Sequence, residues 1–132
     1  LETSELLCAQ GNKVTIVEMA DAIAPGAYFQ HVDDAIPKLK AADTTFLTSS
    51  KLVKINPNGI EIENTKSGAT SSIAVDFVVL SMGCRPDTSL YDELINTKDR
   101  DYKVYKIGDC VKVGRIANAT ESAYQLAIKL NR

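Results

Sequence analysis

A carboxylate ends a short apolar segment near the start of the chain, where it could bind a sugar. Lys13–Glu18 reads Lys-Val-Thr-Ile-Val-Glu, which predicts a strand buried inside a parallel sheet. At the carboxyl end of such a strand, Glu18 could accept hydrogen bonds from both hydroxyls of an adenosine ribose. It would repel a 2′-phosphate, and no Arg follows in Met19-Ala20-Asp21 to neutralise one, so we expect NADH to be preferred over NADPH. The alternative is a solvated acid at a strand end.

The elements around Glu18 predict the second half of a dinucleotide-binding βαβ unit. Residues 2–10 place apolar side chains on one helical stripe, and Gly11 suits a left-handed helix end. The strand 13–18 follows directly. The first half of such a unit, a strand and a G-x-G-x-x-G turn whose amides hold the pyrophosphate, would precede residue 1. We therefore expect the chain by itself to bind NADH weakly or not at all and to be inactive.

The remaining pattern predicts an α/β fold, in which a truncated Rossmann-like parallel sheet carries an antiparallel β-meander insertion and flanking helices. Asp33 or Asp34 could begin a helix with Pro37 in its first turn. Asn58-Gly59 and Ser67-Gly68 separate alternating segments, as hairpin turns do. Continuous apolar segments elsewhere predict buried strands. The expected strands are 44–48, 51–55, 60–64, 71–75, 77–81 and 102–107, and a final helix covers 115–130.

The composition is that of an ordinary globular protein and excludes several classes of partner. Of 132 residues, 45% are hydrophobic and 24% are charged, with a net charge of −2. This balance provides no broad basic surface for nucleic acid. No apolar segment approaches the roughly 20 residues that cross a bilayer, so we expect no membrane partner. Three widely spaced cysteines and a single His31 indicate reduced thiols, a cytoplasmic location and no metal site.

Four motifs follow one another along the chain. The first runs through Glu2–Met19, and the second is Asp21–Pro25. The third, Leu80–Asp87, reads Leu-Ser-Met-Gly-Cys-Arg-Pro-Asp, and the fourth, Val104–Asp109, ends in Gly-Asp. In this order they resemble flavoproteins of the pyridine-nucleotide:disulfide-oxidoreductase type. The resemblance is strongest to the C-terminal part of NADH:flavin oxidoreductases, which include 2,4-dienoyl-CoA reductases and 2-enoate reductases.

The resemblance implies two domains and two cofactors. Residues 1–83 would form an NAD(H)-binding domain that lacks its first strand and glycine loop, and residues 84–132 the C-terminal segment of an FAD-type domain. In the intact parent protein, hydride or electrons would pass from NADH to FAD, with FMN and an iron–sulfur cluster expected elsewhere in the parent. We expect no cofactor to bind tightly to this chain alone. Cys84 and Cys110 do not form a redox pair, so no catalytic residue is assigned, and the cofactors carry the chemistry.

To Glu18 the resemblance adds four further cofactor contacts. Glu2 matches an acid near the nicotinamide, and Gly83 matches a glycine where the chain passes back towards the flavin domain. Gly108 and Asp109 match a strand-ending Gly-Asp whose carboxylate binds a ribityl hydroxyl of FAD. From the residues alone, Gly83 is equally well a strand-ending glycine, and Asp109 could be a turn acid.

Two residues depart from the family pattern. Lys106 replaces a small apolar residue, and Ser122 stands where a glycine often lets the final helix approach the flavin. Two function classes therefore stay open: part of an enzyme that reduces enoates or enoyl thioesters, or a non-catalytic fragment or nucleotide-sensing domain. A methyltransferase fits less well, because the meander and the Gly-Asp ending do not suit one. The coding sequence just upstream of residue 1 would discriminate between the first two classes.

The absent first strand would leave a gap in the parallel sheet between strands 13–18 and 77–81. Exposed strand edges favour pairing with another strand. Residues 102–107 have the same strand-glycine-helix order as the lost unit. We therefore expect them to fill the gap, either within the chain or by exchange between two chains of a homodimer.

Overall fold

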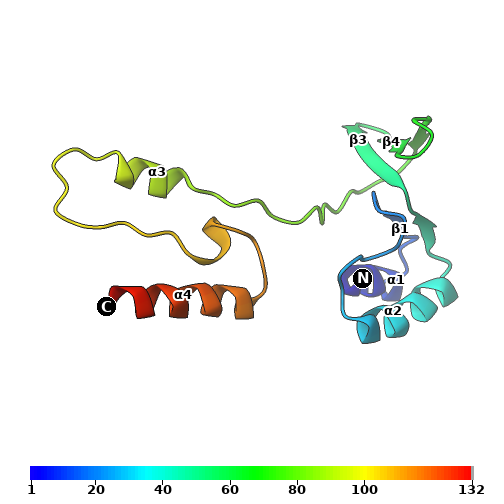
Figure 1. The fold of residues 1–132 in the computed structure, drawn as a ribbon. Coiled ribbons are helices and arrows are strands. Elements are labelled where there is room, and N and C mark those ends of the chain that lie inside the picture. Colours follow the sequence, from blue (N-terminus) through cyan, green and yellow to red (C-terminus); the bar gives the residue numbers. More distant parts are fainter. Residues whose placement is uncertain (132) are drawn as a thin grey trace. The chain divides into compact units, whose positions relative to one another are not determined.

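The computed structural model describes residues 1–131 and divides the chain into two compact units, Leu1–Val79 and Leu80–Arg132 (Figure 1). The first unit is a mixed α/β structure that begins with α1 (Glu2–Ala9) and β1 (Thr15–Val17). Gly11 has a φ of +84°, the left-handed conformation expected after the helix. The helix α2 (Phe29–Ala41) and the strand β2 (Thr45–Leu47) follow. β1 and β2 pair in parallel, with Thr15 opposite Thr45, so the predicted parallel pairing is confirmed.

The meander follows as a three-stranded antiparallel sheet in the order β3, β4, β5. Its strands are β3 (Ser50–Asn56), β4 (Gly59–Asn64) and β5 (Thr70–Ile73). Asn56 pairs with Gly59, which leaves a two-residue loop between β3 and β4. The parallel pair, the meander and the flanking helices together confirm the predicted fold class.

The buried core belongs to α2 and β4. Ala35 and Leu39 lie one helical turn apart in α2, and Leu39 is only 1% exposed. In β4, Ile60 and Ile62 are buried on the same face, because alternate residues of a strand share a face. Helix α1 packs beside α2 (Figure 1), and Cys8 Sγ lies 3.3 Å from Thr44 Oγ1 at the end of that layer.

Helix α2 begins earlier than the sequence predicts. The structure starts it at Phe29, so Asp33 and Asp34 lie inside the helix and Pro37 is an interior residue. The prediction that Pro37 occupies the first turn is wrong. Pro37 is exposed, so the carbonyl of Asp33 that loses its helical donor can be hydrated. The start was missed because Tyr28, at the N-cap, makes no side-chain capping bond.

The second unit is built from helices and extended segments. Its elements are α3 (Ser89–Ile95), the short 3₁₀ helix η1 (Gly108–Cys110) and α4 (Ile116–Leu130). The final helix is confirmed to within one residue of its predicted start. Helix α3 was not predicted, although Thr88 at its N-cap is a residue type that often precedes a helix.

Two predicted strands are absent from the described residues. Neither 77–81 nor 102–107 forms a strand, and neither sheet includes them. A strand needs a neighbour for its N–H and C=O groups, and apolar, β-branched composition does not replace that neighbour. The expectation that residues 102–107 fill a gap in the parallel sheet within the chain is therefore wrong.

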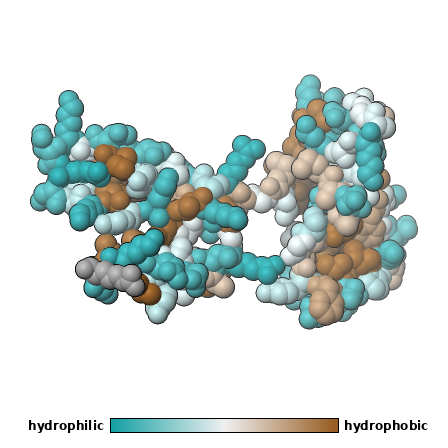
Figure 2. Space-filling view, viewed as in Figure 1, coloured by the Kyte–Doolittle hydropathy of each residue, from teal (hydrophilic) through white to brown (hydrophobic). Residues whose placement is uncertain are grey.

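Apolar side chains form patches on the surface (Figure 2). The most exposed large ones are Phe77 at 90%, Ile116 at 87% and Met82 at 75%. Large contiguous surfaces of this kind often mark sites where other molecules pack. Among residues 1–131, no helix is long and apolar enough to span a bilayer.

Candidate functional site

Glu18 lies directly after β1, at the edge where the parallel strands end. Its backbone is fixed on both sides, because its N–H donates to the Leu47 carbonyl and its carbonyl accepts from the Ser50 N–H, each at 2.9 Å. The half-buried carboxylate accepts the Ala20 N–H through Oε1 at 2.9 Å. The described residues provide no partner for the other carboxylate oxygen, Oε2. This oxygen can accept hydrogen bonds at the carboxyl ends of two parallel strands, as the recognition of a ribose requires.

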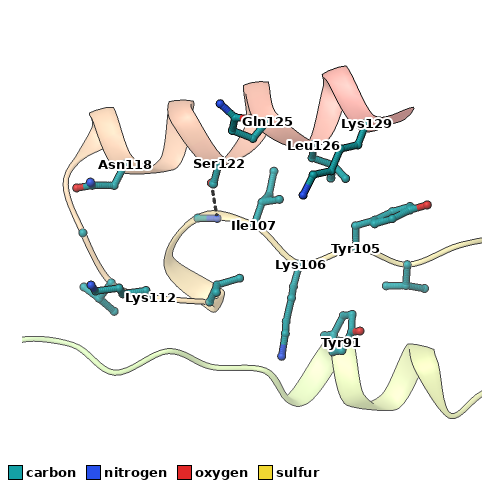
Figure 3. A pocket seen from close by; sticks show the side chains of 15 residues that line it. Tyr91, Tyr105, Lys106, Ile107, Lys112, Asn118, Ser122, Gln125, Leu126 and Lys129 are labelled. Atoms are coloured by element: carbon teal, nitrogen blue, oxygen red, sulfur yellow. Dashed lines mark hydrogen bonds between the residues drawn. The ribbon is translucent and has the colours of Figure 1, made fainter. Parts of the chain in front are cut away.

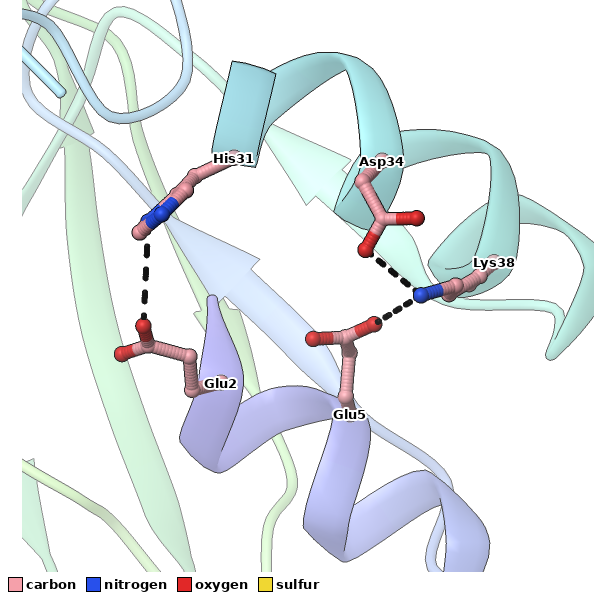
Figure 4. A network of polar contacts seen from close by, with 5 residues as sticks. All are labelled: Glu2, Glu5, His31, Asp34 and Lys38. Atoms are coloured by element: carbon pink, nitrogen blue, oxygen red, sulfur yellow. Dashed lines mark hydrogen bonds and ion pairs between the residues drawn. The ribbon is translucent and has the colours of Figure 1, made fainter. Parts of the chain in front are cut away.

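Glu2 lies in the first turn of α1 and is exposed. Its Oε1 is 3.9 Å from His31 Nδ1 of α2 (Figure 4). A carboxylate in the first turn also interacts favourably with the positive end of the helix dipole. Glu2 makes no described contact with Glu18, so the structure gives these two predicted site residues separate surroundings.

A second ion-pair group joins the same two helices (Figure 4). Lys38 Nζ pairs with Asp34 on its own helix and lies 3.8 Å from Glu5 Oε1 of α1. The hydrogen bond to Asp34, with the nearby charges of Asp34 and Glu5, raises the pKa of Lys38 above its ordinary value. All three side chains are partly or largely exposed. These ion pairs therefore help to orient α1 and α2 but add little to stability.

Gly83 occupies a position whose backbone suits glycine. Its φ is +74°, in the left-handed region that L side chains rarely adopt. A Cβ added there would meet no atom within 4 Å. Within the described residues, backbone conformation rather than close packing therefore accounts for this glycine.

Gly108 and Asp109 form the start of η1 and are the two predicted site residues that lie together. Gly108 has a φ of +63°, and its N–H donates to Ser122 Oγ of α4 at 2.9 Å (Figure 3). Asp109 is exposed, and its Oδ1 accepts the Gly114 N–H at 3.2 Å. Its Oδ2 has no partner among the described residues. The turn thus presents one carboxylate oxygen that can accept a hydroxyl of a ligand.

A pocket of about 630 Å³ lies beside this turn, between α4, the segment that leads into η1 and Tyr91 of α3 (Figure 3). Three lysines and no carboxylate line it, and Asp109 is not among the lining residues. The Lys106 ammonium lies 4.6 Å from the centre of the Tyr91 ring, a cation–π contact. Lys106, unusual for the family, is therefore accommodated on an aromatic face. Sequence reasoning did not select Tyr91, because α3 was not predicted.

Known relatives identify the type of protein to which these features belong. A family model described as pyridine nucleotide-disulphide oxidoreductase matches residues 1–125. The chain is 32% identical over 127 residues to a bilirubin reductase of Mediterraneibacter gnavus. It is 31% identical over 126 residues to an NADH oxidase of Thermoanaerobacter brockii. Each match covers 96% of this chain and 19% of the relative, so the chain spans about a fifth of these proteins.

Two solved structures are also similar to this chain. A 2-naphthoyl-CoA reductase in complex with 2-naphthoyl-CoA matches with a TM-score of 0.71 and 27% identity, over 96% of this chain and 19% of that one. A histamine dehydrogenase from Rhizobium sp. 4-9 matches with a TM-score of 0.81, over 98% of this chain and 21% of that one. At 21% identity, the second match shows the fold alone. Because the family model matches nearly the whole chain, the chain belongs to the pyridine nucleotide-disulphide oxidoreductase family.

Proposed function

We propose that this chain is the nucleotide-binding portion of a longer flavin-dependent NADH oxidoreductase that resembles the enoate and dienoyl-CoA reductases. The activities of its relatives support this proposal, because they include an NADH oxidase and a reductase of an aromatic CoA thioester. The share of the relatives that the chain covers, 19%, supports a role within a larger polypeptide. The substrate site and any FMN or iron–sulfur cluster would lie in other parts of that polypeptide. We place it in the cytoplasm, in keeping with three free cysteines.

The proposal divides the chain into an NAD(H)-binding part, residues 1–83, and a segment of an FAD-type domain, residues 84–132. The boundary between the two compact units, after Val79, supports a division near this point. When bound, NAD(H) and FAD supply the hydride and its acceptor. The residues of this chain bind and orient these groups.

The first part of the proposal assigns Glu18 to the ribose of NADH. Its Oε2 would accept the ribose hydroxyls of NADH, while the bond from the Ala20 N–H to Oε1 holds the carboxylate in place. A second negative charge, the 2′-phosphate of NADPH, would be repelled. Glu2 would lie near the nicotinamide, by resemblance to the family.

The second part of the proposal assigns Asp109 to the ribityl chain of FAD. Its Oδ2 suits a ribityl hydroxyl of FAD, because a carboxylate oxygen accepts strongly from a hydroxyl group. Gly108 would let the backbone turn at this point, and Gly83 would do the same where the chain leaves the nucleotide domain. This donor and acceptor chemistry fits both cofactors.

The proposal predicts that the chain alone binds NADH weakly and turns over nothing. None of its 132 residues form a G-x-G-x-x-G turn, which supplies the amides that hold a pyrophosphate. Calorimetric titration of NADH into the 132-residue chain should therefore give a dissociation constant above about 1 mM, which corresponds to roughly 4 kcal/mol of binding free energy. A low-micromolar constant would contradict this prediction and would favour a nucleotide-sensing domain that acts by itself.

We also consider a homodimer that forms through unpaired strand edges. In the described residues β1 pairs only with β2, so its other edge can accept a strand. We favour a strand of the longer polypeptide as the partner. Light scattering on the 132-residue chain tests the alternative, because a dimer at micromolar concentration would favour a second copy.

A further inference from the structure

The side chain of Ser122 connects α4 to the Gly108–Asp109 turn. Its Oγ accepts the Gly108 N–H at 2.9 Å and donates to the Ala119 carbonyl, also at 2.9 Å. The serine is half-buried, 14 residues along the chain from its glycine partner. A hydroxyl both accepts and donates, so one side chain satisfies both backbone groups.

The turn and the helix lie close together at this contact. A Cβ added to Gly108 would be 3.5 Å from the Ala119 Cβ, which is ordinary van der Waals contact. Within this close approach, the described residues offer the Gly108 N–H no acceptor other than Ser122. Removing the hydroxyl would leave the amide without its partner and would free the start of η1 from α4.

The same turn is fixed at a second point. Asp109 Oδ1 accepts the Gly114 N–H at 3.2 Å, just before α4 begins. The Arg115 N–H in turn donates to Asn118 Oδ1 at 2.9 Å, which caps the helix. Two anchors, one at Gly108 and one at Asp109, therefore determine the direction in which the free carboxylate oxygen points.

We propose that Ser122 is a positioning residue that holds the Gly108–Asp109 turn on α4 and thereby orients the Asp109 carboxylate towards a flavin hydroxyl. The inference rests on the proposed function, since it takes FAD as the ligand of Asp109. In the family pattern a glycine often stands at this position, and a glycine offers no side chain to the turn. This chain therefore holds its Gly-Asp turn with a side-chain contact that a glycine cannot make.

Three substitutions test the inference: Ser122→Ala, Ser122→Thr and Thr120→Ala. The first removes the hydroxyl and the second retains one. Thr120 is the matched control, because its Oγ1 donates only to the Ile116 carbonyl on the same helix. Helix content by circular dichroism shows that each variant folds.

The first measurement is hydrogen exchange of the Gly108 amide in the 132-residue chain. Loss of one hydrogen bond of about 1 kcal/mol should speed this exchange roughly fivefold in Ser122→Ala. Ser122→Thr and Thr120→Ala should stay within about twofold of the wild type. An unchanged Gly108 exchange rate in Ser122→Ala would overturn the inference.

The second measurement is FAD affinity, by fluorescence titration of the longer flavoprotein after its flavin is removed. Ser122→Ala should weaken FAD binding roughly fivefold, and Ser122→Thr should restore it. Unchanged FAD affinity alongside faster Gly108 exchange would mean that the contact is merely structural, and would overturn the positioning role. If the wild type binds no FAD, the proposed function fails, and the flavin role of Ser122 with it. Gly108 exchange would still report separately on the contact.

Discussion

All the buried hydrophobic residues of the described chain lie in the first unit, Leu1–Val79, and none lies in the second, Leu80–Arg132. The first unit contains both sheets, whose strands find their partners within the unit. The second contains helices and extended segments, with Tyr105 and Ile107 exposed at 46% and 38%. Both units expose apolar side chains that other protein segments can cover, but only the first unit has buried apolar residues of its own among those described.

The largest expected effect follows from the core of the first unit. Leu39→Ala should lower its free energy of unfolding by about 2–5 kcal/mol, because a fully buried leucine leaves a cavity when it is truncated. The matched control, Leu90→Ala in α3, removes a side chain that is 66% exposed and should cost less than about 0.5 kcal/mol. Urea unfolding followed by circular dichroism measures both. An equal loss of unfolding free energy in the two variants would contradict the conclusion that the first unit has a buried core at Leu39 and the second unit is exposed at Leu90.

A smaller effect is expected in the meander. A Cβ on Gly59 would lie 2.1 Å from the Ile73 carbonyl oxygen, so Gly59→Ala must displace the backbone of β4 or β5. We expect a loss of about 1–3 kcal/mol in the free energy of unfolding. Gly68→Ala is the control, since its Cβ would meet nothing within 4 Å and only its φ of +72° opposes the change. The same urea titration should rank Gly59→Ala as the more damaging; the reverse order would refute the close approach.

The smallest expected effects are on the pH dependence of stability. The first unit loses a contribution as the pH rises, and the second loses one as the pH falls. The hydrogen bond to Asp34 is the main cause that raises the pKa of Lys38. The contribution of Lys38 to stability is therefore complete below pH 10.5 and is lost as the pH rises through the raised pKa. The Ser89 N–H lowers the pKa of Asp87 below 3.8, so that contribution is present above pH 3.8 and is lost as the pH falls through the lowered value. NMR titration of each side chain measures these shifts. A lowered Lys38 or a raised Asp87 pKa would contradict the described contacts.

The meander of the first unit was predictable because its strands pair with strands that are close in the sequence. The Asn58-Gly59 signal lies where the loop after β3 leads into β4, with Gly59 as the first residue of β4, so the sequence pattern of one short segment contains both strands of the hairpin. Residues 102–107 have a similar apolar pattern, but a strand there depends on a neighbour that no nearby residue supplies. The pattern alone therefore overestimated the number of strands.

The candidate site was predictable in part. The position of Glu18 follows from an apolar strand that ends in an acid, and the structure places it at the end of β1. The contact of Ser122 with Gly108 joins residues 14 positions apart through a turn and a helix, and no periodic pattern encodes it. Likewise, the Lys106–Tyr91 contact could not be foreseen without α3.

The nucleotide preference of the proposed longer flavoprotein, with and without Glu18→Gln, tests the account most directly. Steady-state turnover with NADH or NADPH as the reductant gives kcat/KM for each. We expect the wild type to prefer NADH. Glu18→Gln should lower kcat/KM for NADH about tenfold and narrow that preference, because an amide accepts more weakly from ribose hydroxyls and does not repel a 2′-phosphate. Glu63→Gln, in β4, should change neither value. An unchanged NADH-to-NADPH ratio in Glu18→Gln would contradict the assignment of this carboxylate to the ribose.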